Sequence, residues 1–474
     1  MDILYVTSEA APYSASGGLG DVMGALPQAV KAASPEDRVS VILPYYKNKV
    51  PKKLASDFRF VCEFRFRYVW RDAYAGIYAA ESGGVTYYFV DNEQYFLRDG
   101  LYGQFDDGER FAFFSTAVLE FMIRMEKKPD VLHANDWQSA LTVVYLRTKY
   151  RSVKEFRSIK TVYTIHNIEY QGKYDLAILG DIFGLEEWDR PIVEYDGCIN
   201  LMKGAIVMAD RVTTVSPNYA CELRQAYFAY GLQHVINANG HKLSGIINGI
   251  DTAYFSPDKG GDIAFPYSAE NVWEGKAKNK AALQSELGLP VRRDVPLAVM
   301  ITRLARQKGV DLLTCILDEL LGTDMQFVIL GTGDVDYEKT LGEIAARHPD
   351  KMRALIQFDR ALSKRLYASA DLFLMPSRSE PCGLAQMIAC SYGTIPVVRA
   401  VGGLYDTIVP YGKEGANGFV FNNYNAHELL FRTKDALSLY RNPDEWGKLI
   451  LGAMKTDFTW DRSAKKYLSL YRGL

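Results

Sequence analysis

Short apolar runs recur along the whole chain, and the stretches between them have helical spacing. Within each run nearly every position is apolar, which is typical of parallel strands covered by helices on both faces. The pattern therefore predicts an α/β protein with two doubly wound, Rossmann-like domains. The expected strands are Ile3–Thr7, Val39–Leu43, Val131–Ala134, Thr161–Ile165, Val212–Val215, Gly245–Ile247, Leu297–Ile301, Phe327–Leu330, Ala354–Phe358, Leu372–Met375, Ile395–Val398 and Phe419–Phe421.

One stretch alternates instead. From Phe58 to Val90 apolar residues alternate with charged residues and tyrosines. This pattern predicts an antiparallel β-hairpin or meander inserted in the first domain. We place the first domain at residues 1–247 and the second at 248–456. A helix over 457–474 follows, and it could pack on either domain.

Composition excludes several classes of protein. The 474 residues include 55 Lys and Arg against 57 Asp and Glu, which argues against a strong overall field for nucleic acid or an anionic membrane. The six cysteines are scattered, as expected in a reducing cytoplasm. No signal-type segment or membrane-length apolar run is present, so we expect a soluble cytoplasmic protein.

A glycine-rich turn follows the first apolar run, at Ser16-Gly17-Gly18-Leu19-Gly20-Asp21. Such a turn before a helix presents backbone N–H groups and the positive end of the helix dipole to an anion. We expect positive φ angles and close ligand approach at Gly17 and Gly18, and a helix cap at Asp21. A tight turn without a ligand is the alternative.

Two further strands of the first half end in polar groups. Asp136 and Trp137 follow one strand, where they could orient a hydroxyl and lie against a sugar ring. The alternative is a helix cap at Asp136 and a core position for Trp137. His166 and Asn167 follow the next strand; the histidine could be an acid/base, a hydrogen-bond donor or a structural residue. No partner at ligand spacing supports a metal role.

The second half supplies cations and a carboxylate. Arg303, Arg306 and Lys308 follow a strand and precede a glycine, a placement suited to phosphate. The turn Ser379–Leu384 follows another strand. We expect Pro381 at the first helical position, with the amides of Cys382 and Gly383 beside the Glu380 carboxylate, a set that suits a sugar diol. A third glycine turn, Gly402-Gly403-Leu404, could meet a diphosphate.

Together these motifs resemble the bacterial glycogen synthases and plant starch synthases, retaining glucosyltransferases with two Rossmann-like domains facing a central cleft (GT-B). The resemblance covers Met1 to about Leu474 and is carried by seven ordered motifs: SEAAPYSASGGLGDV, VLHANDWQ, YTIHNIEYQG, GIINGID, TRLARQKGVD, PSRSEPCGLAQM and VRAVGGLYDT. It implies transfer of glucose from ADP-glucose to the non-reducing end of an α-1,4-glucan, and a last helix that crosses back to the first domain.

The resemblance also implies roles for individual residues. Arg303 and Lys308 would neutralise the leaving diphosphate, while Glu380 and the two amides after it would hold the glucose hydroxyls. His166 would contact the donor sugar, and Phe358 takes the place of an adenine-stacking tyrosine. The acceptor side would be lined by Tyr102, Asp136, Trp137, Asn167 and Asn248.

Two positions depart from the family pattern. Ala15 stands where the family usually has the lysine of K-T-G-G-L, so a diphosphate contact is missing unless Ser14, Ser16 or another cation supplies it. That loss is worth about 1.5–3 kcal/mol. Ile388 stands where many retaining relatives have glutamate, so other groups must hold the ribose.

The mechanism expected from the sequence is front-side attack, because no double-displacement nucleophile is evident. Domain closure would exclude water. No paired-Asp metal motif is present, and we expect no metal requirement and no cofactor beyond the donor. The open alternatives are a transferase with a small acceptor such as a sugar phosphate, and a glucan-binding protein that has lost turnover. Uracil as the donor base, and hence UDP-glucose as the donor, also remains open.

Overall fold

The computed structural model describes every residue of the chain except Gly260. The described residues form two compact units. The first contains Met1–Gly249 together with Trp460–Leu474, and the second contains Ile250–Thr459. The prediction of two doubly wound α/β folds is confirmed by their sheets.

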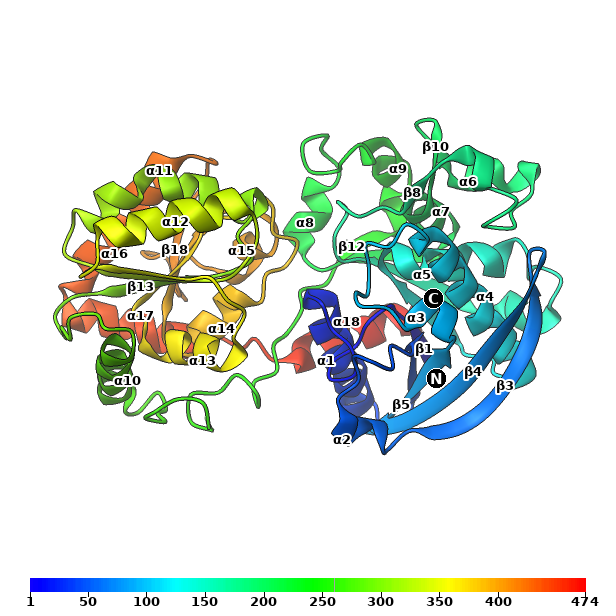
Figure 1. Ribbon diagram of the computed structural model, residues 1–474, viewed down its shortest axis with the longest axis horizontal. Helices are drawn as coiled ribbons and strands as arrows, with labels where there is room; N and C mark the ends of the chain where they lie inside the picture. Colours follow the sequence, from blue (N-terminus) through cyan, green and yellow to red (C-terminus); the bar gives the residue numbers. More distant parts are fainter. Residues whose placement is uncertain (260) are drawn as a thin grey trace. The chain divides into compact units, whose positions relative to one another are not determined.

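The first unit is built on a nine-stranded sheet in the order β12-β11-β7-β6-β1-β2-β5-β4-β3 (Figure 1). Neighbouring strands are parallel from β12 to β5. The strands are β1 (Asp2–Val6), β2 (Arg38–Pro44), β3 (Arg59–Tyr68), β4 (Arg71–Ser82), β5 (Val85–Asp91), β6 (Val131–Asn135), β7 (Lys160–Ile165), β11 (Arg211–Thr214) and β12 (Leu243–Gly245). A small second sheet joins β8 (Lys173–Tyr174), β10 (Cys198–Asn200) and β9 (Glu194–Tyr195).

Helices surround this sheet, and the longest follow its parallel strands. They are α1 (Gly18–Ala33), α2 (Lys52–Ala55), α3 (Glu93–Phe96), α4 (Asp107–Arg124), α5 (Asp136–Arg147), α6 (Arg190–Val193), α7 (Leu201–Met208), α8 (Pro217–Glu222), α9 (Gln233–Ala238) and α18 (Trp460–Arg472). Because parallel strands need crossover connections, the polar groups that follow β1, β6 and β7 meet at one edge of the sheet.

The predicted hairpin is confirmed, with one difference. Strands β3, β4 and β5 are antiparallel neighbours, and the last two are joined through Gly83 and Gly84 at φ +57° and +75°. However, β5 also pairs in parallel with β2, so the meander extends the main sheet. Its alternating pattern reflects an edge with one solvent-facing side.

Helix α18, the last of the chain, packs beside α1 in the first unit (Figure 1). Its residues Trp460, Ala464, Tyr467, Leu468 and Tyr471 belong to the same buried cluster as β1 and β2. The Tyr471 hydroxyl also lies 2.8 Å from the hydroxyl of Tyr5 and 2.7 Å from Nδ1 of His133. Residues more than three hundred positions apart are thus joined in one core.

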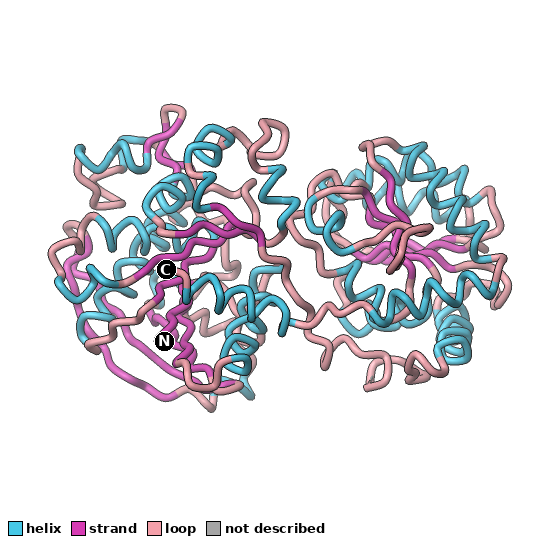
Figure 2. Tube along the Cα trace, turned by 180° about the vertical axis from the view of Figure 1, so that it is seen from behind, coloured by secondary structure: helices cyan, strands magenta, loops and turns pink. Residues whose placement is uncertain are grey.

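The second unit has a six-stranded parallel sheet in the order β15-β14-β13-β16-β17-β18, and Figure 2 shows helices on both of its sides. The strands are β13 (Leu297–Ile301), β14 (Gln326–Leu330), β15 (Met352–Leu355), β16 (Leu372–Met375), β17 (Ile395–Arg399) and β18 (Phe419–Phe421). The helices are α10 (Val272–Glu286), α11 (Val310–Leu321), α12 (Val335–Arg347), α13 (Arg360–Ser369), α14 (Ala385–Ser391), α15 (Gly402–Thr407), α16 (Ala426–Tyr440) and α17 (Pro443–Lys455).

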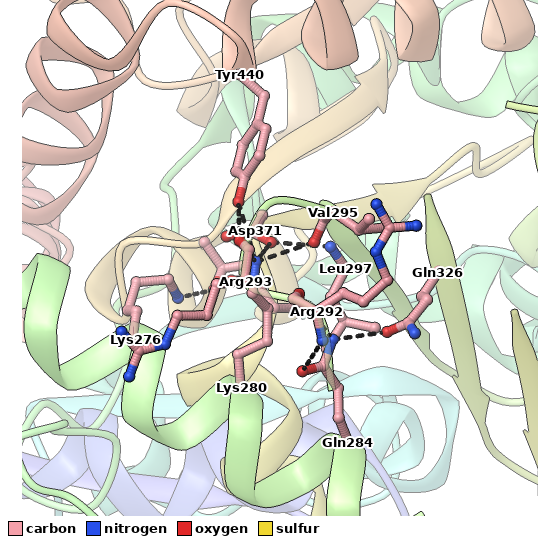
Figure 3. Close-up of polar contacts among 12 residues, drawn as sticks. Lys276, Lys280, Gln284, Arg292, Arg293, Val295, Leu297, Gln326, Asp371 and Tyr440 are labelled. Carbon is pink, nitrogen blue, oxygen red and sulfur yellow. Dashed lines mark hydrogen bonds and ion pairs between the residues drawn. The ribbon is translucent and has the colours of Figure 1, made fainter. Parts of the chain in front are cut away.

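Two buried lysines fasten α10 to this unit (Figure 3). Lys280 Nζ lies 2.8 Å from Oδ2 of Asp371, just before β16. Lys276 Nζ donates to Oγ1 of Thr394 at 2.8 Å and to the Tyr392 carbonyl at 3.1 Å. Burial lowers the pKa of Lys276 to about 7. The sequence of this helix is polar, yet Lys276 and Lys280 point into the unit. Their ammonium groups can be buried because backbone carbonyls and the Asp371 carboxylate accept their hydrogen bonds.

Two edge strands differ from the expected positions. Strand β12 begins at Leu243 and β15 at Met352, two residues earlier than predicted in each case. The buried residue of β15 is Met352, which pairs with Phe327, whereas Ile356 and Phe358 are exposed. Apolar content alone gave the wrong bounds for these strands, because pairing with the neighbouring strand decides where they begin and end.

Candidate active site

The glycine turn of the first unit is fastened by a carboxyl group. Glu9, which is 2% exposed, accepts hydrogen bonds from the amide of Ser16 and from its hydroxyl at 2.9 Å. Burial raises the pKa of Glu9 to about 7. Because both Ser16 donors are engaged by Glu9, this residue does not replace the family lysine missing at Ala15.

The turn does not use positive φ angles, contrary to our expectation. Gly17 is extended at φ −170°, and Gly18 is the first residue of α1. A Cβ atom built on either glycine would meet nothing within 4 Å, so the space above this turn is open. The expected cap at Asp21 is also wrong, since Gly17 is the N-cap and Asp21 lies inside the first turn of α1.

Asp136 connects two neighbouring strand ends. Its Oδ1 atom accepts the backbone N–H of His166 at 2.7 Å and that of Asn167 at 3.3 Å. The residue has φ +55°, a left-handed conformation that is strained for aspartate and typical of functional sites. Burial raises its pKa to about 7, and the charge of Glu9 adds to the rise. Asp136 is the first helical residue of α5 and does not cap it.

His166 is held as a neutral imidazole. Its Nε2 lies 3.0 Å from Oδ1 of Asn135, whose amide nitrogen donates to the carbonyls of Val6 and His133. The amide oxygen of Asn135 therefore accepts, so Nε2 carries the proton and Nδ1 is the acceptor nitrogen. Burial lowers the pKa of His166 to about 3.

The expected acceptor-side residues fall into two groups. The hydroxyl of Tyr102 lies 2.7 Å from Oγ of Ser8, and its pKa is raised by burial and then by Glu9. The buried amide oxygen of Asn248 has no hydrogen-bond partner in the described protein. Trp137 instead packs in the core, edge-on to Phe111 with ring centroids 5.2 Å apart. The core alternative is therefore confirmed, and the ring exposes no face on which a sugar could stack.

In the second unit Lys308 and Glu380 form an ion pair at the carboxyl edge of the sheet. Lys308 Nζ lies 2.7 Å from Oε2 of Glu380, and Ser377 Oγ donates to the same oxygen at 3.0 Å. The lysine follows β13 and the glutamate follows β16, which are adjacent parallel strands. Glu380 is 6% exposed, so the lysine compensates a carboxylate that has lost most of its water.

The Glu380 turn packs directly on the third glycine turn. The amide of Gly403 donates to the Glu380 carbonyl at 3.1 Å, and that of Leu404 donates to Val401 at 3.0 Å. A Cβ on Gly402 would lie 1.9 Å from the Glu380 carbonyl oxygen, so glycine is required for this approach. The amides of Gly403 and Leu404 are thus engaged within the fold, and their contact with a diphosphate stays a prediction.

The helix after Glu380 starts later than predicted. It begins at Ala385, with Leu384 as N-cap, so Pro381 is not at its first position. Cys382 is 5% exposed, and Gly383 has φ +74°, a conformation that favours glycine. A Cβ on Gly383 would meet the Gln386 side chain at 2.5 Å.

Two expected donor residues are exposed on the second unit. Within the described part of the chain, the Arg303 side chain makes one long hydrogen bond, to Gln307 at 3.5 Å. The ring of Phe358, 81% exposed, follows edge strand β15. Among the described residues, no three His, Cys, Asp or Glu side chains are grouped to hold a metal, and no helix is long and apolar enough to cross a bilayer.

Comparison with known proteins identifies the family. Residues 2–238 match the starch synthase catalytic domain, and residues 288–449 match the glycosyl transferases group 1. The glycogen synthase of Streptococcus pneumoniae serotype 2 strain D39 is 46% identical over 479 residues, covering 100% of both chains. The chain belongs to the starch and glycogen synthase family. The chain is a retaining glycosyltransferase.

Solved structures agree with this assignment. The catalytic domain of starch synthase IV from Arabidopsis thaliana, bound to ADP and acarbose, aligns with a TM-score of 0.91 at 33% identity over 99% of this chain and 98% of that chain. The GT-B fold is therefore shared. A sucrose-phosphate synthase from Thermosynechococcus elongatus aligns with a TM-score of 0.61 at 17% identity, a likeness of fold alone.

Sequence reasoning missed Glu9 as a residue of this site. The letters Ser-Glu-Ala after the first strand are part of the family's opening motif, which was the only signal available. Its hydrogen bonds to Ser16 show that it shapes the glycine turn. Asp136, His166 and Asn167 in the first unit follow strand ends, as do Lys308 and Glu380 in the second. Tyr102 instead lies between α3 and α4, and Trp137 is in the core.

Proposed function

We propose that this chain transfers glucose from ADP-glucose to the non-reducing end of an α-1,4-glucan with retention of configuration. The observation that carries the proposal is the Lys308–Glu380 pair at the strand ends of the second unit, in a chain 46% identical to a glycogen synthase along its full length. The ADP and acarbose bound to the Arabidopsis relative support an adenine donor and a glucan acceptor.

In this proposal the second unit handles the leaving group. Lys308 offers Glu380 one of its three ammonium protons, and the others are available to a phosphate oxygen. Exposed Arg303 adds a forked donor. As the bond to the anomeric carbon breaks, negative charge accumulates on the diphosphate, and cations already in place lower the barrier. The Phe358 ring would stack on the base.

The first unit would position the sugars. The neutral His166 donates through Nε2 to Asn135, and its ring orientation is fixed by that bond. The open turn at Gly17 and Gly18 would admit a phosphate close to backbone amides. Because no double-displacement nucleophile is evident, the departing phosphate would itself accept the proton of the attacking hydroxyl. The proposed mechanism uses no metal ion. A cytoplasmic location of the protein stays a prediction.

Steady-state kinetics with ADP-glucose and UDP-glucose on glycogen tests the proposal. We expect ADP release with ADP-glucose as the preferred donor, lengthened α-1,4 chains, and equal rates with and without EDTA. Transfer to small sugar phosphates without chain growth would identify a different acceptor class. Glucan binding without nucleotide release from either donor would mean that the chain has lost turnover, a possibility raised by Ala15.

A further inference from the structure

An open pocket of about 550 Å³ lies on the second unit beside β18, the edge strand of the sheet. Tyr411 and Phe419 form one wall, and the second half of α16 forms the other with Arg432, Asp435 and Ser438. Asn442, just after that helix, completes the lining. The volume falls within the range of ordinary ligand sites, about 300–1,000 Å³.

The aromatic wall is rigid and partly exposed. The Tyr411 ring stacks on Phe419 with centroids 5.6 Å apart and planes 28° from parallel. Phe419 is 3% exposed, whereas Tyr411 is 42% exposed. Backbone bonding fixes the tyrosine as well, since its amide donates to the Gly418 carbonyl at 2.8 Å. A ring held in this way is a platform for a flat, weakly polar surface such as the C–H face of a pyranose.

Planar polar groups stand opposite this ring. Arg432 pairs with Asp435 at 2.9 Å, and the buried Nε of Arg432 has no hydrogen-bond partner in the described protein. Asn442 accepts the Glu445 amide through Oδ1 at 3.4 Å, which leaves its NH₂ group as a donor. An aromatic face beside carboxylate, guanidinium and amide groups matches a sugar ring, which carries hydroxyls around its edge.

The pocket lies near the amino ends of the parallel strands, whereas Glu380 lies at their carboxyl ends. Strands β16, β17 and β18 are parallel, and Glu380 follows the carboxyl end of β16. Phe419 is the first residue of β18, at its amino end, and α16 runs back alongside that strand, so Arg432 and Asp435 lie toward the same end. The pocket is therefore separate from the Lys308–Glu380 pair.

We propose that this pocket is a second binding site for an α-1,4-glucan chain, which holds the polymer while transfer occurs elsewhere. The proposal rests on the proposed function for the choice of ligand. Among the described residues lining the pocket, Arg432 is the single cation and Asp435 neutralises it, so the pocket does not favour a nucleotide diphosphate. A second grip on a long polymer raises the effective concentration of its chain ends without any change in catalysis.

The test compares long and short acceptors. Tyr411→Ala should raise the apparent KM for glycogen roughly three- to tenfold, the worth of one aromatic stack. The kcat, and the KM values for maltotriose and ADP-glucose, should not change. Tyr411→Phe should keep most of the affinity because the ring remains, and Asp435→Asn should weaken it. The matched control is Phe431→Ala, an exposed ring on the same helix that does not line the pocket.

Direct binding separates this proposal from the proposed function. In native gels containing glycogen, the full-length protein should be retarded, and Tyr411→Ala should run faster than Phe431→Ala. This result would stand even if no donor were turned over. An unchanged glycogen KM together with unchanged retardation would overturn the proposal. An equal rise in the KM for maltotriose in Tyr411→Ala would also overturn it. So would a pocket that binds ADP through Tyr411 and does not bind maltohexaose.

Discussion

The two units keep their candidate site residues in opposite electrostatic conditions. In the first unit, burial raises the pKa values of Glu9 and Asp136 to about 7 and lowers that of His166 to about 3, so all three favour uncharged forms. In the second unit, Lys308 is paired with Glu380, and Arg303 is exposed. One unit excludes charge and the other supplies it, which suits a reaction in which a neutral sugar leaves an anionic diphosphate.

The largest effect should come from the charged unit. Lys308→Ala removes the cation that both balances Glu380 and, in our proposal, receives the diphosphate. We expect kcat/KM for ADP-glucose to fall about 100- to 1,000-fold, the loss typical of one stabilising donor in a transition state. The control is Lys339→Gln, at an exposed lysine of the same unit, which should leave kcat/KM for ADP-glucose unchanged. A loss below tenfold in a folded Lys308→Ala protein would place the stabilising charge elsewhere.

Adding charge to the first unit sharpens the comparison from the other side. Ala15→Lys restores the family's cation at an exposed position beside the glycine turn. A charge-assisted contact with the diphosphate should raise kcat/KM about tenfold. Ala15→Met, with a long uncharged side chain, should give no gain. An unchanged rate in both variants would mean that this position does not limit the reaction.

Replacing the neutral histidine should have a smaller effect. His166→Gln keeps a donor toward Asn135 and removes the ring, so we expect kcat to fall about three- to tenfold, the worth of a neutral hydrogen bond. Because the pKa of His166 is about 3, the wild-type rate should show no titration of this group between pH 5 and 8. His234→Gln is the exposed control in the same unit. A rate limb near pH 6.5 that disappears in His166→Gln would contradict the neutral assignment.

The smallest expected effect is a pH-dependent change in stability at Glu9. A folded pKa of about 7, against 4.5 for the free group, means that folding favours the protonated acid. Its penalty is therefore absent below pH 4.5, grows as the pH rises to about 7, and is constant above that. Glu9→Gln should raise Tm more at pH 8 than at pH 5, while the exposed control Glu155→Gln should not. A larger gain at pH 5 would reverse the sign and refute the assignment.

Much of the fold could be predicted because the second unit's strands are continuous apolar runs. The run 297–301 coincides with β13, and 372–375 coincides with β16. Edge strands were less predictable, as β15 shows, because pairing with one neighbour sets their register. The polar appearance of α10 concealed Lys276 and Lys280, whose burial depends on carbonyls and Asp371 far away in the sequence.

The candidate site was predictable in its residues more than in its geometry. Strand ends and glycine turns pointed to Asp136, His166, Lys308 and Glu380, and the structure links each of them to a partner. The burial of Trp137 depends on Phe111 and a neighbouring loop, so sequence left it open. The backbone approach of Gly402 to Glu380 was equally invisible, because it joins two separate turns.

The most direct test of this division between the units compares two donors in two variants. With ADP-glucose, Lys308→Gln and His166→Gln should both be slow. With α-glucosyl fluoride, whose leaving group carries no diphosphate, Lys308→Gln should recover to within about threefold of wild type, a difference worth less than one hydrogen bond. His166→Gln should remain impaired by the same factor. An equal loss of Lys308→Gln on both donors would contradict the claim that the second unit's cation acts on the departing diphosphate.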